Sequence, residues 1–103
     1  QSQTFTLLTG AVALSGEWAD IDKTLYGTVY YKLSGSAAGS TATFTLETRD
    51  PVGNGGYILH TIPLTGTNIT NISTFSTPIT NGVRANISSI SNGSGYIYLD
   101  CGY

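Results

Sequence analysis

Apolar and polar residues alternate along most of the chain with a period of two. Successive side chains of a β-strand point to opposite faces, so this alternation predicts strands with one buried and one exposed face. Gly, Asn, Ser and Pro interrupt the alternation about every ten residues. The predicted strands are 4–8, 11–14, 23–33, 41–49, 57–64, 69–75, 83–89 and 96–101. No stretch keeps the apolar spacing of an amphipathic helix beyond about two turns.

The same alternation predicts which side chains face the interior. In strand 23–33 the inward positions are Leu25, Gly27, Val29, Tyr31 and Leu33. In strand 41–49 Ala42, Phe44 and Leu46 are expected inside, and Thr43, Thr45, Glu47 and Arg49 outside. In the last strand the inward positions are Ile97, Leu99 and Cys101. Gly27 predicts a bulge or a close approach, and Pro63 predicts an edge strand or a bulge.

Composition agrees with a thin, β-rich core. Gly, Ser and Thr make up 40 of the 103 residues, and only 10% of the residues are charged. The length fits one domain, 1–103. Short strands separated by regular turns are typical of two packed antiparallel sheets. The predicted fold is an all-β antiparallel sandwich of seven to eight strands, either a jelly roll or Ig-like.

Several functional classes are excluded by the same inventory. Four basic residues cannot form the positive stripe of a nucleic-acid interface, and no apolar run reaches the ~18 residues of a membrane span. We therefore expect neither nucleic acid nor membrane as a partner. One Cys cannot form an internal disulfide, and one Cys with one His cannot complete a zinc site. No cofactor is predicted. Cys101 is interpreted as a small buried side chain, with an intermolecular disulfide as the alternative.

From residue 44 to residue 101 the order of features resembles a known group of proteins. Strand 44–50 leads into a Gly-rich turn, the next strand ends at 64–66, Phe75 and Pro78 precede segment 83–87, and a Gly-bounded strand follows. This order is similar to the small β-sandwich modules of tailed-bacteriophage virion proteins, in head-decoration and tail or fibre components. The resemblance implies a non-enzymatic structural or adhesive role.

Catalytic chemistry has few candidates. His60 is the only histidine, and no Ser or Thr lies in the sequence context of an activated nucleophile. The carboxylates Glu17, Asp20 and Asp22 cluster in one predicted loop, but they lack the ligand order of a dedicated calcium loop. We therefore predict no enzymatic activity, no catalytic residues and no metal site. His60 is interpreted as a partly buried or interface histidine.

Aromatic residues are the candidate contact residues. Tyr26 and Tyr30 fall on the polar face of strand 23–33, and Tyr96 and Tyr98 on the polar face of the last strand. Tyrosine combines apolar area with a polar tip, so outward tyrosines on Thr-rich faces suit a subunit contact or a sugar platform. Trp18 either stacks on a sugar or closes one end of the sandwich.

These observations predict a virion structural protein. The expected role is capsid decoration (cement) or an accessory subunit that binds and stabilises neighbouring coat subunits, located in the extracellular virion. Expected partners are other virion structural proteins and further copies of the same chain, because a sparsely charged surface suits a symmetric assembly. The alternative is a carbohydrate-binding module of a receptor-binding or extracellular protein. A third option is a subunit of a pilus or surface layer.

Overall fold

The computed structural model describes residues 2–19, 26–36, 39–76 and 81–102. The structure has eight strands, and buried positions alternate with more exposed ones over most of β3, β4 and β8, as the sequence pattern predicts. They are β1 (Ser2–Gly10), β2 (Leu14–Ser15), β3 (Tyr26–Gly35), β4 (Thr41–Thr48), β5 (Tyr57–Thr65), β6 (Asn68–Phe75), β7 (Val83–Ser91) and β8 (Gly93–Gly102). Within these ranges there is no helix with the length and hydropathy that a membrane crossing needs.

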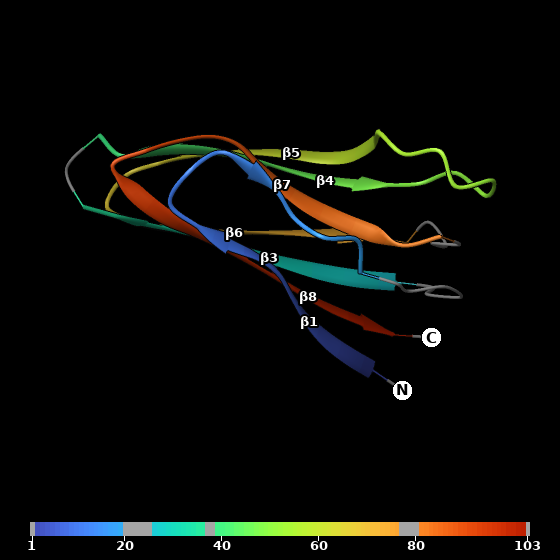
Figure 1. The fold of residues 1–103 in the computed structure, drawn as a ribbon. Helices are drawn as coiled ribbons and strands as arrows, with labels where there is room; N and C mark the ends of the chain where they lie inside the picture. The colour runs from blue at the N-terminus through green and yellow to red at the C-terminus, as the bar shows by residue number, and fades with distance from the viewer. Residues whose placement is uncertain (1, 20–25, 37–38, 77–80, 103) are drawn as a thin grey trace.

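The strands form two four-stranded antiparallel sheets that lie one above the other (Figure 1). One sheet has the order β1-β8-β3-β6 and the other has the order β2-β7-β4-β5. The first strand therefore pairs with the last, the second with the seventh, the third with the sixth and the fourth with the fifth. This nested pairing across two sheets is the jelly roll, which decides between the two predicted sandwich types. Because β1 and β8 pair, the two ends of the chain lie close together (Figure 1).

The core lies between the two sheets and consists of the inward positions of all the long strands. Tyr31 of β3 and Phe44 of β4 come from opposite sheets, and their rings stack with centroids 6.1 Å apart. The fully or nearly fully buried apolar residues also include Val29, Leu33, Leu46, Val83, Ala85, Ile87, Ile97 and Leu99. Strand alternation therefore assigned the interior correctly for the described residues of β3, β4 and β8, whereas Leu25 of the predicted inward set lies outside the described residues.

Local details confirm some expectations and correct one. A Cβ atom on Gly27 would lie 2.3 Å from Cζ of Phe75, so the glycine permits a close approach, as predicted. Pro63 lies in β5, which is an edge strand of its sheet. The strand predicted at 11–14 is instead the two-residue β2, because exposed residues 11–13 carry the chain from one sheet to the other.

Candidate contact face

The outer side of the β1-β8-β3-β6 sheet carries a row of side chains from all four strands. Tyr98 pairs with Thr6 on β1 and with Tyr30 on β3, and Tyr30 pairs with Ile72 on β6. These residues share one register position, so their side chains stand next to one another on the same face. We call this outer side the tyrosine face and the three large side chains Tyr98, Tyr30 and Ile72 the central row.

The central row is open to solvent although it is largely apolar. The exposed fractions are 38% for Tyr98, 45% for Tyr30 and 54% for Ile72. A shallow groove of about 390 Å³ runs along the row and is also lined by Lys32, Thr70 and Asn71. Its lining therefore combines the aromatic and aliphatic side chains of the row with three polar residues. This composition suits a surface that another molecule covers.

All four predicted tyrosines lie on this face. Tyr26 is 54% exposed. Tyr96 is half-buried, lies two residues from Tyr98 along β8, and pairs with Lys32 of β3. Ile72 was not among the sequence candidates. The alternation in strand 69–75 could have placed it outside, but only the pairing of β3 with β6 sets it beside Tyr30.

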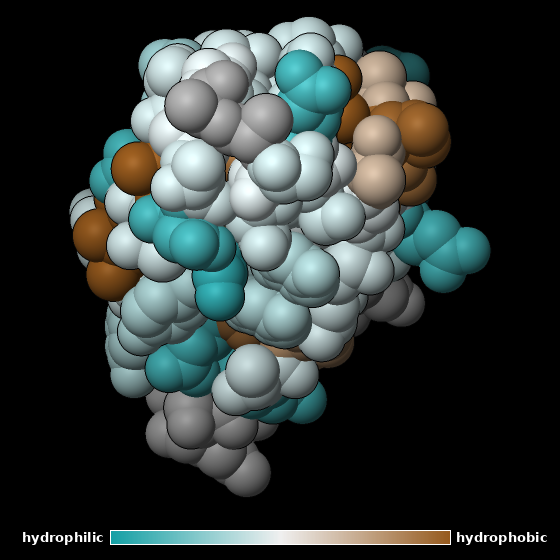
Figure 2. Space-filling view, turned by 90° about the vertical axis from the view of Figure 1, so that its left-hand side faces the viewer, coloured by the Kyte–Doolittle hydropathy of each residue, from teal (hydrophilic) through white to brown (hydrophobic). Residues whose placement is uncertain are grey.

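Charge on the tyrosine face is sparse and balanced. Among the described residues, the ionisable charges at its outward strand positions are Lys32 on β3 and Asp100 on β8. They lie on opposite sides of the central row. The other three strands carry threonines in register with Asp100, which are Thr4, Thr28 and Thr74. Figure 2 looks onto one end of the sandwich, where the pale colour of Ser, Thr and Gly also dominates the surface. The weak polarity is therefore not confined to the tyrosine face.

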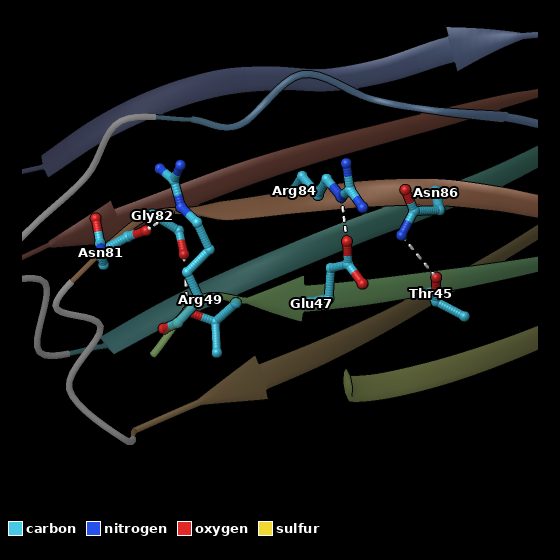
Figure 3. A network of polar contacts seen from close by, with 8 residues as sticks. Thr45, Glu47, Arg49, Asn81, Gly82, Arg84 and Asn86 are labelled. Atoms are coloured by element: carbon cyan, nitrogen blue, oxygen red, sulfur yellow. Dashed lines mark hydrogen bonds and ion pairs between the residues drawn. The ribbon is translucent and has the colours of Figure 1, made fainter. Parts of the chain in front are cut away.

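Trp18 is held by two cations on the opposite sheet. The guanidinium carbons of Arg49 and Arg84 lie over its ring, 4.5 Å and 4.6 Å from the centroid. Figure 3 shows that the guanidinium groups of Arg49 and Arg84 are well apart from each other. A Cβ on Gly55 would lie only 3.1 Å from Cζ2 of the indole ring, so the backbone at Gly55 also packs closely against it. Of the two alternatives for Trp18, these contacts fit a structural role, whereas stacking on a sugar stays a prediction.

A polar network anchors the arginines that hold Trp18 (Figure 3). Nε of Arg84 on β7 donates to Oε1 of Glu47 on β4, which forms an ion pair. Nε of Arg49 donates to the Asn81 carbonyl at 2.8 Å. Cation–π contacts and charge-assisted bonds are stronger where water is partly excluded, so this cluster fixes the outer surface of the second sheet.

Glu47 is a second correction. Glu47 was expected on an exposed face, but it is only 4% exposed. It does point to the outer side of its sheet, as the alternation predicts, and pairs there with Arg84. A bulge between Leu46 and Glu47 interrupts the pairing with β5 at this point. The fold buries Glu47 beside Arg84, which only the tertiary structure could show.

The loop after β4 is organised by Asp50. Its Oδ1 accepts the amides of Val52 and Asn54 at 3.0 Å and 2.9 Å, and its Oδ2 accepts the Tyr57 hydroxyl at 3.0 Å. Desolvation acts to raise the pKa of Asp50, but these hydrogen bonds outweigh it and lower the pKa below 3.8. The bond to Asp50 raises the pKa of Tyr57 above 10.0.

These shifts predict a pH-dependent loop. The lowered pKa of Asp50 stabilises the fold above pH 3.8, and this contribution is lost as the pH falls through the folded-state pKa. In an NMR titration, the amide shifts of Val52 and Asn54 should change with a midpoint below 3.8. Tyr57→Phe removes a donor to the carboxylate, so the midpoint should move upward. An unchanged midpoint in this variant would contradict the assigned bond.

His60 joins the two sheets at their open edge. It lies on edge strand β5, is half-buried, and its Nε2 lies 2.9 Å from the carbonyl oxygen of Thr74 on edge strand β6. The half-buried position agrees with the first alternative of the interpretation, a partly buried or interface histidine. Cys101 is 3% exposed and belongs to the core, as expected for a small buried side chain.

The acidic residues form no grouped metal site in the ranges that the structure describes. Glu17 is exposed there, whereas Asp20 and Asp22 of the predicted acidic loop lie outside the described residues. Glu47 and Asp50 are each committed to the contacts above. The described carboxylates of the second sheet therefore have structural partners of their own.

Comparison with known proteins identifies the fold. No family model matches the sequence, and no curated protein matches it. The SPBc2 prophage-derived protein YomS is similar over 98% of this chain and 92% of its own, with a TM-score of 0.72 and 12% identity. The C-terminal CBM6 of LamC, a laminarinase of Zobellia galactanivorans, is similar over 100% of this chain and 100% of its own, with a TM-score of 0.58 and 10% identity. A chain in the structure of infectious bursal disease virus, Gx strain, has a TM-score of 0.58 and 16% identity over 98% of this chain and 32% of its own.

Proposed function

We propose that this protein is a non-enzymatic structural subunit of a phage-type virion. Its specific role is capsid decoration or a related accessory function, in which it binds neighbouring subunits through the tyrosine face and stabilises their junction. The observation that carries the proposal is the exposed central row, Tyr98, Tyr30 and Ile72, on a face with two balancing charges. The largest exposed apolar patch of a soluble protein is often a functional contact surface.

The chemistry of the central row fits subunit contact better than catalysis. Tyrosine supplies contact area with little loss of side-chain entropy, and its hydroxyl accepts a polar environment at the rim. Neighbouring strands hold the three side chains, so little order has to be gained on binding. Many copies acting together would convert a modest contact into firm attachment. The fold similarity to a prophage-derived protein and to a viral chain supports the virion location.

Carbohydrate binding is the second candidate, and a specific observation favours it. The rings of Tyr30 and Tyr98 are neighbours, and the groove beside them also contains Lys32 and Asn71, which can bond to sugar hydroxyls. The similarity to a CBM6 fits this reading. Titration with cellotriose, followed by amide shifts of β3 and β8, separates the two. Saturable shifts confined to this groove would favour the sugar-binding module over the structural subunit.

Incorporation into particles gives a direct test of the structural role. When wild-type protein and Ile72→Ser are produced together, the variant should be depleted in purified particles by about tenfold, because a polar side chain interrupts the apolar row. Mass spectrometry of intact or digested particles measures the ratio of the two forms.

Ile58→Ser is the matched control for this competition. Ile58 is 52% exposed against 54% for Ile72, and it lies on the edge strand of the other sheet. It should enter particles as well as wild type does. Equal incorporation of Ile72→Ser, or equal depletion of both variants, would refute the tyrosine face as the contact surface.

A further inference from the structure

We propose that the molecule covering the tyrosine face is a second copy of this chain, packed face to face about a two-fold axis that runs along the central row. This inference rests on the proposed function and adds the identity of the partner. It is carried by the positions of the two charges on the face relative to the row.

Lys32 and Asp100 lie on opposite sides of the central row. Lys32 is two residues beyond Tyr30 on β3, and Asp100 is two residues beyond Tyr98 on β8. Because the two strands are antiparallel, these two steps lead in opposite directions along the strands. Each charge is therefore displaced by about 7 Å from the row, at roughly 3.3 Å per residue. The two charges come from adjacent strands, which lie about 4.8 Å apart.

A two-fold rotation about the row reverses the direction along the strands and keeps the order across them. Lys32 of one copy then lies at the level of Asp100 of the other, one strand spacing to the side, and the same contact occurs twice. Asp100 also comes to face Tyr96 of the other copy, whose hydroxyl can donate to it. An axis parallel to the strands keeps each charge at its own level and brings no opposite charges together.

The apolar part of the face fits the same arrangement. Tyr98, Tyr30 and Ile72 each meet their own symmetry mate on the axis, as an isologous interface requires. Two sheets with the same twist pack face to face about 10 Å apart, and side chains from both faces fill this space. Tyrosine rings and an isoleucine are long enough to meet at that distance, whereas the flanking threonines leave room for the lysine.

The size of the face sets the strength of the contact. Four strands and about eight residues of each give roughly 500 Å² per copy, or about 1,000 Å² in total. This area lies at the lower limit for a specific interface. The isolated chain should therefore be in a reversible monomer–dimer equilibrium in the micromolar range, and multiple contacts in a particle would reinforce it.

Sedimentation velocity with charge reversals tests the arrangement. Wild-type protein is measured from low micromolar to near-millimolar concentration, beside Lys32→Glu, Asp100→Lys and the double variant. Each single reversal should raise the dissociation constant by at least about tenfold, because it creates two like-charge contacts. The double variant should restore wild-type association. Glu17→Lys is the control for Asp100→Lys, since it makes the same charge change at an exposed residue outside the face.

Each outcome decides a separate question. A wild-type chain that stays monomeric over the whole range overturns the two-fold dimer. If the single reversals leave the dissociation constant of the dimer unchanged, or if the double variant does not restore it, the proposed axis is overturned. If Ile72→Ser is still depleted from particles in either case, the structural function stands and the partner is a different subunit. If neither dimerisation nor selective depletion occurs, the proposed function fails as well.

Discussion

Phe44→Ala is expected to lower the free energy of unfolding by about 3–5 kcal/mol, a large part of the ~5–15 kcal/mol that stabilises a typical domain. Phe44 has no exposed surface and stacks on Tyr31 of the other sheet. A Cβ on Gly95 would lie 2.6 Å from its Cε1, so the ring rests directly on the backbone of β8. Truncation opens a cavity between the sheets that these rigid neighbours cannot fill.

Urea denaturation measures this loss. Ile58→Ala provides the control, because it also shortens an aliphatic side chain but at a position that is 52% exposed. It should change the free energy of unfolding by less than about 1 kcal/mol. A loss below about 1 kcal/mol for Phe44→Ala would mean that the two sheets do not pack through this ring.

Arg84→Leu is expected to cost about 2–3 kcal/mol of stability. Breaking a buried ion pair leaves an uncompensated charge and typically costs about 3–5 kcal/mol, and the 30% exposure of the Arg84 side chain reduces this value. Glu47, which is only 4% exposed, is then left without its cation. The same substitution also removes one of the two cations that hold the indole ring.

A double-mutant cycle with Glu47→Gln separates the ion pair from general packing. In the wild-type background Glu47→Gln should destabilise the protein, because it removes a charge-assisted bond. In the Arg84→Leu background it should stabilise the protein, because it neutralises a buried unpaired charge. Additive effects of the two substitutions in urea denaturation would show that the ion pair contributes no coupling.

The sequence by itself determined the strands and their faces. Alternation with period two is a local property of the backbone, so it predicts the inward set of β3, β4 and β8 without knowledge of their partners. It also placed Tyr26, Tyr30, Tyr96 and Tyr98 outside. Scarce charge and abundant Thr, Ser and Gly, likewise readable from composition, indicated a weakly polar surface.

Only the tertiary structure decided which strands are neighbours, because pairing depends on contacts between residues far apart in the chain. The pairing of β8 with β3 and of β3 with β6 turned Tyr98, Tyr30 and Ile72 into one row. It also set the guanidinium groups of Arg49 and Arg84 over the ring of Trp18. The burial of Glu47 has the same origin: strand alternation gives the direction of a side chain, whereas its exposure depends on what the rest of the fold places over it.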